Sequence, residues 1–125
     1  MTTSITIKDS AGTDTVFTVV RQPSGNQSAI LHAVNVTAGM NRTGYAKVEL
    51  STRIVNGKTT PVASVTVPFG AVVNGNFVKS GQVSDTRQAT QPADAPEKAR
   101  LDAAAFAKNL AANAQVAALF ETGLI

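Results

Sequence analysis

A two-residue turn signal in the middle of the chain constrains the fold more than any other feature. Asn56-Gly57 is typical of a type I′ hairpin turn, in which both central residues need a positive φ. If they form the turn, Val55 lies opposite Lys58 and the register of both flanking strands is fixed. A slip of one residue would destroy the resulting separation into two faces. The predicted apolar pairs are Ala46 with Val67, Val48 with Val65 and Leu50 with Ala63, and the predicted pairs on the polar face are Lys47 with Thr66, Glu49 with Ser64, Ser51 with Val62 and Arg53 with Thr60.

Pro61 is unfavourable in this hairpin, because proline has no N–H to donate to a strand ladder. We therefore expect a bulge or an unpaired N–H opposite Thr52.

The rest of the first 93 residues predicts further strands separated by turns. Alternation and β-branched residues favour strands, and clusters of Gly, Pro, Asn and Ser favour turns. The predicted strands are 4–8, 15–20, 29–36 and 76–87; the predicted turns, loops and linkers are 9–12, 22–26, 39–44, 69–75 and 88–93.

The pattern changes to helix after residue 93. Asp94 followed by Glu97 resembles a capping box, and Pro96 fits a first helical turn. Residues 99–112 favour helix throughout, Asn113 predicts a break or a cap, and 114–121 predicts a second short helix that ends at Gly123. The polar stripe of the first helix is narrow, and consists of Lys98, Asp102 and Asn109.

These elements predict one α+β domain over residues 1–125, with strands and helices segregated along the chain. It comprises an N-terminal β-hairpin (1–21), an antiparallel meander sheet (28–87) and two C-terminal helices (94–122). Hydrophobic residues make up 43% of the chain and charged residues 15%, which suggests further burial between subunits, although an Ala-rich and Val-rich single domain explains the composition equally well.

Composition also excludes several classes of protein. The chain has no cysteine, so disulfides and Cys-based metal sites are excluded, and one histidine with scattered acids does not suggest a metal site. We expect no cofactor, secretory signal, membrane span or small-molecule substrate. His32 is expected to be an ordinary strand histidine with a satisfied hydrogen bond, because no partner nucleophile or paired carboxylates are recognisable, and we expect no enzyme.

The positive charge is concentrated in the strand region. Residues 1–92 hold eight Lys and Arg against four acids, whereas residues 93–125 hold three against four. A basic surface attracts polyanions through counterion release. The polar face of the central hairpin is the best candidate, since Lys47, Ser51 and Arg53 share it with Thr60, Ser64 and Thr66, although a solvated sheet face has the same composition.

The order and several residues of the chain resemble the coat proteins of single-stranded RNA bacteriophages, the leviviruses. The strongest part of the resemblance is 45–53 followed by 63–68, which is similar to the family's central hairpin and its Val-x-Val-Pro ending. The connection from Pro68 to Asn76 resembles the loop that clusters around capsid symmetry axes. The Ala-rich helices and the ending Gly123-Leu124-Ile125 resemble the family too.

The resemblance implies an intertwined homodimer in which the sheets join and the helices of each subunit cross the partner's sheet. Such dimers assemble, in the host bacterial cytoplasm, into an icosahedral shell that packages genomic single-stranded RNA. One RNA stem-loop bound on the inner face represses translation of the replicase. The RNA-binding residues implied are Lys47, Ser51 and Arg53, with Thr60 and Ser64 by facing and Lys58 and Lys79 for their charge.

Glu49 also lies on this face, where it would repel phosphate unless it accepts a hydrogen bond from a base amino group.

Two alternatives remain open at this stage. One is another self-assembling structural subunit, of the tail or pilus type, without specific RNA binding. The other is a small α+β enzyme or ligand-binding domain with a pocket lined by His32.

Overall fold

The computed structural model describes residues 4–24, 27–35 and 39–123. The chain divides into two compact units, one up to Thr90 and one from Gln91 onward, which are described separately.

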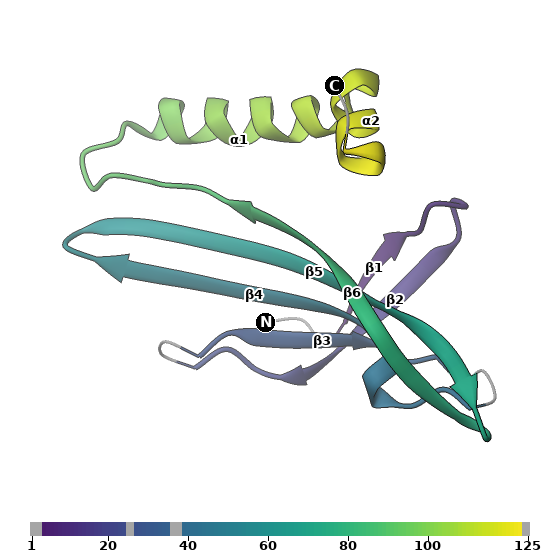
Figure 1. Cartoon of the computed structure of the whole chain (residues 1–125). Helices are drawn as coiled ribbons and strands as arrows, with labels where there is room; N and C mark the ends of the chain where they lie inside the picture. Colours follow the sequence, from purple (N-terminus) through teal and green to yellow (C-terminus); the bar gives the residue numbers. More distant parts are fainter. Residues whose placement is uncertain (1–3, 25–26, 36–38, 124–125) are drawn as a thin grey trace. The chain divides into compact units, whose positions relative to one another are not determined.

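The first unit is a six-stranded antiparallel sheet in which every strand pairs with its neighbour in sequence. Figure 1 shows the strands as successive arrows, with the β4–β5 and β5–β6 turns at opposite ends of the sheet. This meander confirms the predicted order of strands. The strands are β1 (Ser4–Lys8), β2 (Asp14–Arg21), β3 (Ala29–Ala33), β4 (Ala46–Val55), β5 (Lys58–Val73) and β6 (Asn76–Gln88).

The central hairpin has the predicted turn and register. Asn56 and Gly57 have φ of 51° and 76°, as a type I′ turn requires. Every predicted pair from Val55–Lys58 to Lys47–Thr66 is present. The ladder between β4 and β5 starts at Lys47, so the predicted pair of Ala46 with Val67 lies just beyond it.

Of the two alternatives predicted at Pro61, a bulge or an unpaired N–H opposite Thr52, the bulge is absent, because Thr52 and Pro61 pair in an unbroken register. Pairs in an antiparallel ladder alternate between hydrogen-bonded and non-hydrogen-bonded, starting here from the pair that flanks the turn. By this count Thr52–Pro61 is a non-hydrogen-bonded pair, so the proline nitrogen points away from β4. The Pro61 carbonyl accepts a hydrogen bond from the Ala89 N–H at 3.1 Å.

The apolar connection predicted at 69–75 is a β-hairpin in the structure. β5 continues to Val73 and turns at Asn74 and Gly75, with φ of 52° and 80°. The register shifts between Phe69 and Gly70, which marks a β-bulge. The backbones approach so closely here that a Cβ on Gly70 would clash with the carbonyl oxygen of Val78.

The segment before β4 is attached to the start of β6. A short 3-10 helix, η1 (Arg42–Gly44), is capped by the Asn41 side chain, which accepts from the Thr43 N–H at 3.0 Å. The Asn41 amide also donates to the Phe77 carbonyl at 3.3 Å, and the Phe77 N–H donates to the Gly39 carbonyl at 2.7 Å. These bonds hold η1, and therefore the start of β4, against the β5–β6 hairpin.

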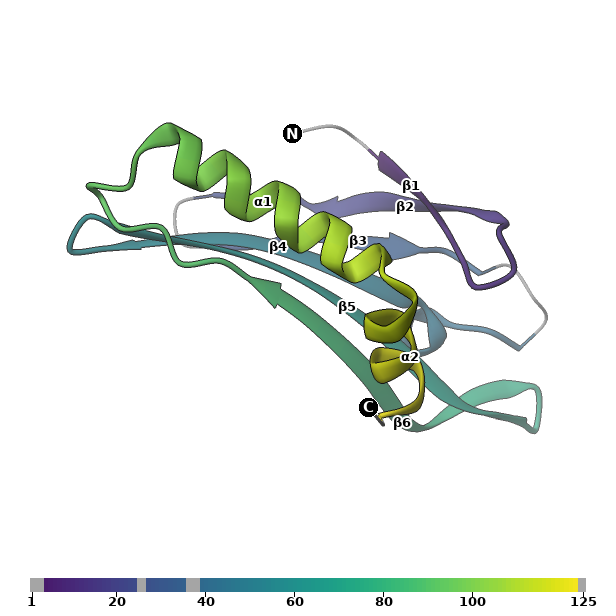
Figure 2. The same cartoon turned by 90° about the horizontal axis from the view of Figure 1, so that it is seen from above.

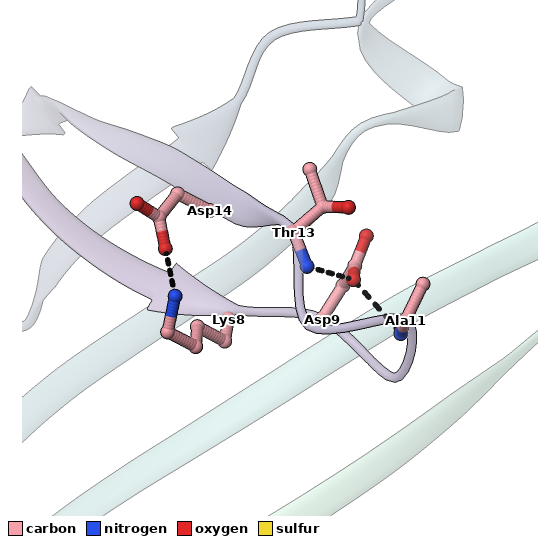
Figure 3. A network of polar contacts seen from close by, with 5 residues as sticks. All are labelled: Lys8, Asp9, Ala11, Thr13 and Asp14. Carbon is pink, nitrogen blue, oxygen red and sulfur yellow. Dashed lines mark hydrogen bonds and ion pairs between the residues drawn. The ribbon is translucent and has the colours of Figure 1, made fainter.

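The N-terminal hairpin is closed by one carboxylate (Figure 3). Asp9 Oδ1 accepts from the backbone N–H groups of Ala11 and Thr13, each at 2.9 Å. Lys8 and Asp14 form an exposed ion pair at 2.8 Å beside this turn. The predicted hairpin is therefore confirmed, with β2 extending to Arg21.

β3 is shorter than the predicted strand 29–36 and ends at Ala33. Val36, like residues 25–26 of the predicted turn 22–26, lies outside the described residues. Ser24 and Gln27 exchange backbone hydrogen bonds at 3.2 and 2.8 Å, so the chain does turn there.

One face of β1–β4 carries the hydrophobic core. Leu31 is fully buried and lies between Val19 and Val48 in the register, so these side chains share a face. The buried residues are Phe17, Ala29, Leu31, Ala33 and Val48, with Ile5, Val19, Ala46 and Leu50 packed against them.

The second unit contains two helices that contact each other, α1 (Glu97–Ala112) and α2 (Ala114–Thr122) (Figure 2). Asn113 caps α2 by accepting from the Gln115 and Val116 N–H groups, and Gly123 ends it at a φ of 76°, as predicted. The predicted capping box is wrong: the N-cap is Pro96, with no side-chain cap. Because α1 begins at Glu97, Asp94 lies two residues too early to cap it.

No helix among the described residues is long and apolar enough to cross a membrane.

Candidate nucleic-acid interface

The β4–β5 register places the predicted binding residues on one face of the sheet. Lys47, Glu49, Ser51 and Arg53 alternate along β4, and their partners across the ladder are Thr66, Ser64, Val62 and Thr60. Directly opposite residues of an antiparallel pair point to the same side. We call this surface, with its continuation on the other strands, the polar face.

The register of the remaining strands extends the polar face across the whole sheet. Thr66 lies opposite Ser84 on β6, and their hydroxyl oxygens are 3.3 Å apart. Lys47 lies opposite His32 on β3, which is opposite Thr18 on β2. One transverse row therefore carries polar side chains on all six strands: Ser4, Thr18, His32, Lys47, Thr66 and Ser84.

Lys58 and Lys79, which the sequence suggested only for their charge, also belong to the polar face by register. Lys58 lies opposite Val55, which continues the alternation of Arg53. Lys79 lies opposite Gly70 just beyond the bulge, and its ammonium group donates to the Gln82 side-chain oxygen. The structure thus brings all eight candidate residues to one side of the sheet.

Glu49 has protein partners that sequence reasoning missed. Its Oε1 accepts a hydrogen bond from the Ser28 hydroxyl at 2.6 Å. Ser28 Oγ in turn accepts from the Arg21 guanidinium at 2.7 Å, and Arg21 Nε donates to the Ser28 carbonyl at 3.0 Å. The acid that was expected to repel phosphate is thus linked through one hydroxyl to a cation. No sequence signal indicated this link, since 21 residues separate Ser28 from Glu49.

The cations of the polar face are available to a polyanion. In the parts of the chain that the structure describes, the ion pairs are Lys8–Asp14 and Lys98–Asp102. No carboxylate there lies within ion-pair distance of Lys47 or Arg53. Lys and Arg in this state can contact phosphates, and the neighbouring hydroxyls can bind sugars or base edges.

His32 differs from the expectation of an ordinary hydrogen-bonded strand histidine. Within the described residues its ring makes no hydrogen bond, but it contacts the Tyr45 ring edge to face, with centroids 6.2 Å apart and planes at 69°. Burial lowers the pKa of His32 below 6.5, and the positive charges of Arg42 and Lys47 lower it further. Burial and both charges therefore favour the neutral imidazole.

The opposite face of β5 and β6 forms a shallow apolar groove. Val67 lies opposite Val83, and both are at least half exposed, at 50% and 64%. The groove is lined by Ala63, Val65, Val67, Val83, Asp85 and Arg87.

Comparisons with protein-family models and with curated proteins found no match. Comparison with solved structures matched the virus-like particle of Beihai levi-like virus 21, with a TM-score of 0.84 and 19% identity over 100% of this chain and 97% of that one. The virus-like particle of bacteriophage NT-214 matches with a TM-score of 0.78 and 16% identity over 93% and 90%. The bacteriophage GA protein capsid matches with a TM-score of 0.65 and 20% identity over 93% and 91%.

The chain has the coat-protein fold of the single-stranded RNA phages. The matches cover at least 90% of each of these three chains. This fold confirms the α+β class and the order of elements predicted from the sequence. At identities of 16–20%, the binding residues of these coat proteins cannot be assigned to positions of this chain by alignment.

Proposed function

We propose that this chain is the structural coat subunit of a single-stranded RNA phage, without enzymatic activity. In this proposal it forms homodimers, which assemble in the host bacterial cytoplasm into a closed shell around genomic RNA. The observation that carries the proposal is a coat-protein fold matched over the full length of the chain by the subunit of a virus-like particle.

Exposed apolar side chains among the described residues support the dimer. Val67, Phe69 and Val83 on the sheet face are at least half exposed. Exposed apolar patches of this kind mark contacts between subunits. The helices carry matching surface, since Leu101, Phe106, Leu110 and Phe120 are 59–73% exposed. In the proposed dimer, the helices of each subunit cover the apolar sheet face of its partner, and the sheets join along the edge strand β6.

Cations of the polar face that have no carboxylate partner among the described residues support RNA as the packaged cargo. Lys47, Arg53 and Lys58 neutralise phosphates, while Ser51, Thr60 and Ser64 contribute hydroxyl donors. Glu49 takes no direct part in this proposal, because it is engaged by Ser28. The same face would hold an RNA stem-loop and thereby repress the replicase message.

The test is expression of the full chain followed by electron microscopy and measurement of nuclease-protected RNA. Closed spheres containing RNA support the proposal. Fibres or tubes would favour a tail or pilus subunit, and a stable monomer at micromolar concentration would contradict the shell altogether.

The RNA part is tested by replacing Lys47 and Arg53 together with alanine. Loss of two single-strand phosphate contacts should reduce the slope of log affinity against log salt by about 1.4. The matched control replaces Arg100 and Lys108 of α1, which removes the same charge from the other unit. Equal RNA content in both variants would show that the polar face is the wrong surface.

A further inference from the structure

The chain's single tyrosine and single histidine meet on the polar face. Tyr45 precedes β4 in extended conformation, with φ of −78° and ψ of 136°, so its side chain continues the alternation of Lys47 and Glu49. His32 reaches the same place from β3, because it lies opposite Lys47. Both rings are partly exposed, and neither belongs to the hydrophobic core on the other face.

Two cations flank this aromatic pair. Lys47 is the cross-strand partner of His32, and Arg42 of η1 is close enough to His32 for its charge to lower the histidine pKa. Within the described ranges neither cation has a carboxylate partner. Two positive charges beside two rings form no ion pair within the subunit. The arrangement therefore adds little to the stability of the folded subunit.

Aromatic rings interleaved with cations are what an unpaired nucleotide requires. Bases stack on aromatic side chains whatever their sequence, while Lys and Arg hold the adjoining phosphates. Thr18 and Thr66 lie on either side of His32 and Lys47 in the transverse row, where their hydroxyls can contribute hydrogen bonds to a sugar. A neutral imidazole suits a stacking surface, because it carries no tightly hydrated charge.

We infer that His32 and Tyr45 form a stacking subsite for one unpaired RNA base, with Arg42 and Lys47 binding the flanking phosphates. The subsite rests on the proposed RNA-binding function and adds a position to it. It lies at the start of β4, whereas Ser51 and Arg53 lie towards the β4–β5 turn. An RNA strand that occupies both would run along β4.

The fluorescence of Tyr45 reports directly on this subsite, because the chain has no tryptophan and no other tyrosine. Full-length RNA-free protein is titrated with a short oligouridylate and with an oligomer of equal length whose bases are replaced by abasic riboses. We expect the oligouridylate to quench Tyr45 fluorescence and the abasic oligomer not to. Absorption of light by RNA is corrected with free N-acetyltyrosinamide.

Variants separate stacking from charge. Affinities of the variants are measured with end-labelled oligomers, because Tyr45 variants lack the fluorescent tyrosine. Tyr45→Leu should weaken oligouridylate binding about tenfold, the scale of one lost base–aromatic stack, and leave abasic binding unchanged. Tyr45→Phe should retain wild-type affinity, and Lys47→Ala should weaken both oligomers equally. Unchanged melting temperature in each variant confirms that the subunit remains folded.

The outcomes distinguish this subsite from the broader proposal. Oligouridylate binding that Tyr45→Leu leaves intact and Lys47→Ala weakens would overturn the subsite while RNA binding stands. If neither oligomer binds wild-type protein, RNA binding by the polar face fails and the subsite fails with it.

Discussion

Ser28 occupies an unusual place among the polar residues of the sheet. It is 9% exposed, and its hydroxyl donates to Glu49 while accepting from Arg21. β2, the turn before β3 and β4 are therefore joined by one oxygen atom. A charge that would oppose RNA on the polar face is balanced inside the protein, which explains how a carboxylate is tolerated among Lys47 and Arg53.

Ser28→Ala should lower the free energy of unfolding by about 1–3 kcal/mol, because it removes both bonds and leaves Glu49 and Arg21 without their bridge. Urea denaturation at fixed protein concentration measures this loss. Ser24→Ala is the control, since among the described residues Ser24 bonds across the neighbouring turn through its backbone. Equal stability of both variants would show that the bridge is energetically unimportant.

His32 predicts a definite sign of pH dependence. Its folded-state pKa is lowered by burial, Arg42 and Lys47, so the unfolded state binds the proton more readily. Stability is therefore complete above the unfolded value of 6.5 and falls as the pH drops below it, until the folded state also becomes protonated. His32→Gln should flatten this part of the profile of unfolding free energy against pH. The single histidine can be followed by NMR, and a midpoint at or above 6.5 would contradict the prediction.

At the scale of elements, the sequence contains two Asn-Gly turns, and the pattern around them predicted only one. Asn56-Gly57 predicted its turn correctly because flanking residues alternate over both strands. Asn74-Gly75 forms the same turn, yet residues 69–73 do not alternate, and the run was interpreted as a connection. Alternation reports burial of one face, so it fails where a two-stranded ribbon extends beyond the rest of the sheet.

The candidate site shows the same division between local and tertiary information. The alternation along β4 predicted the facing of Lys47, Ser51 and Arg53, because the strand period is a local property. The bridge from Glu49 to Ser28 and the ring contact between His32 and Tyr45 depend on which strands become neighbours. Residues 13 and 21 positions apart gave no pattern from which these contacts could be predicted.

The bulge between β5 and β6 predicts a sharp requirement for glycine. Gly70→Ala would place a Cβ against the Val78 carbonyl, which belongs to the backbone and cannot rotate away. We expect the free energy of unfolding to fall by about 1–3 kcal/mol, the usual range for overpacking, and the register of the hairpin to shift. Thermal unfolding and amide hydrogen exchange of residues 70–79 measure these effects.

Gly81→Ala is a useful comparison, because its Cβ would meet the Phe69 ring, a side chain that can move. Gly81→Ala should therefore lower the free energy of unfolding by less than Gly70→Ala. A larger loss for Gly81→Ala than for Gly70→Ala would contradict the assignment of the bulge as the rigid point.

For the whole molecule, the two faces of β6 carry the two halves of the proposed function. Val83 belongs to the apolar groove and Ser84, the next residue, to the polar face opposite Thr66. If the proposed function holds, the strand period separates the assembly surface from the RNA-binding surface by a single position along the chain. The same substitution at these two sites should therefore affect different properties, assembly at Val83 and RNA content at Ser84.

Val83→Asp should prevent assembly. A buried valine contributes about 1.5–3 kcal/mol, a two-fold interface loses it twice, and an unpaired carboxylate adds a desolvation cost. The dimer dissociation constant should therefore rise by at least about 100-fold. Analytical ultracentrifugation should detect small species in place of shells.

Ser84→Asp should still assemble, but its shells should hold less RNA, because the new charge faces the phosphates. Shells formed by Val83→Asp would show that the exposed apolar face of this subunit is not what holds copies of the chain together.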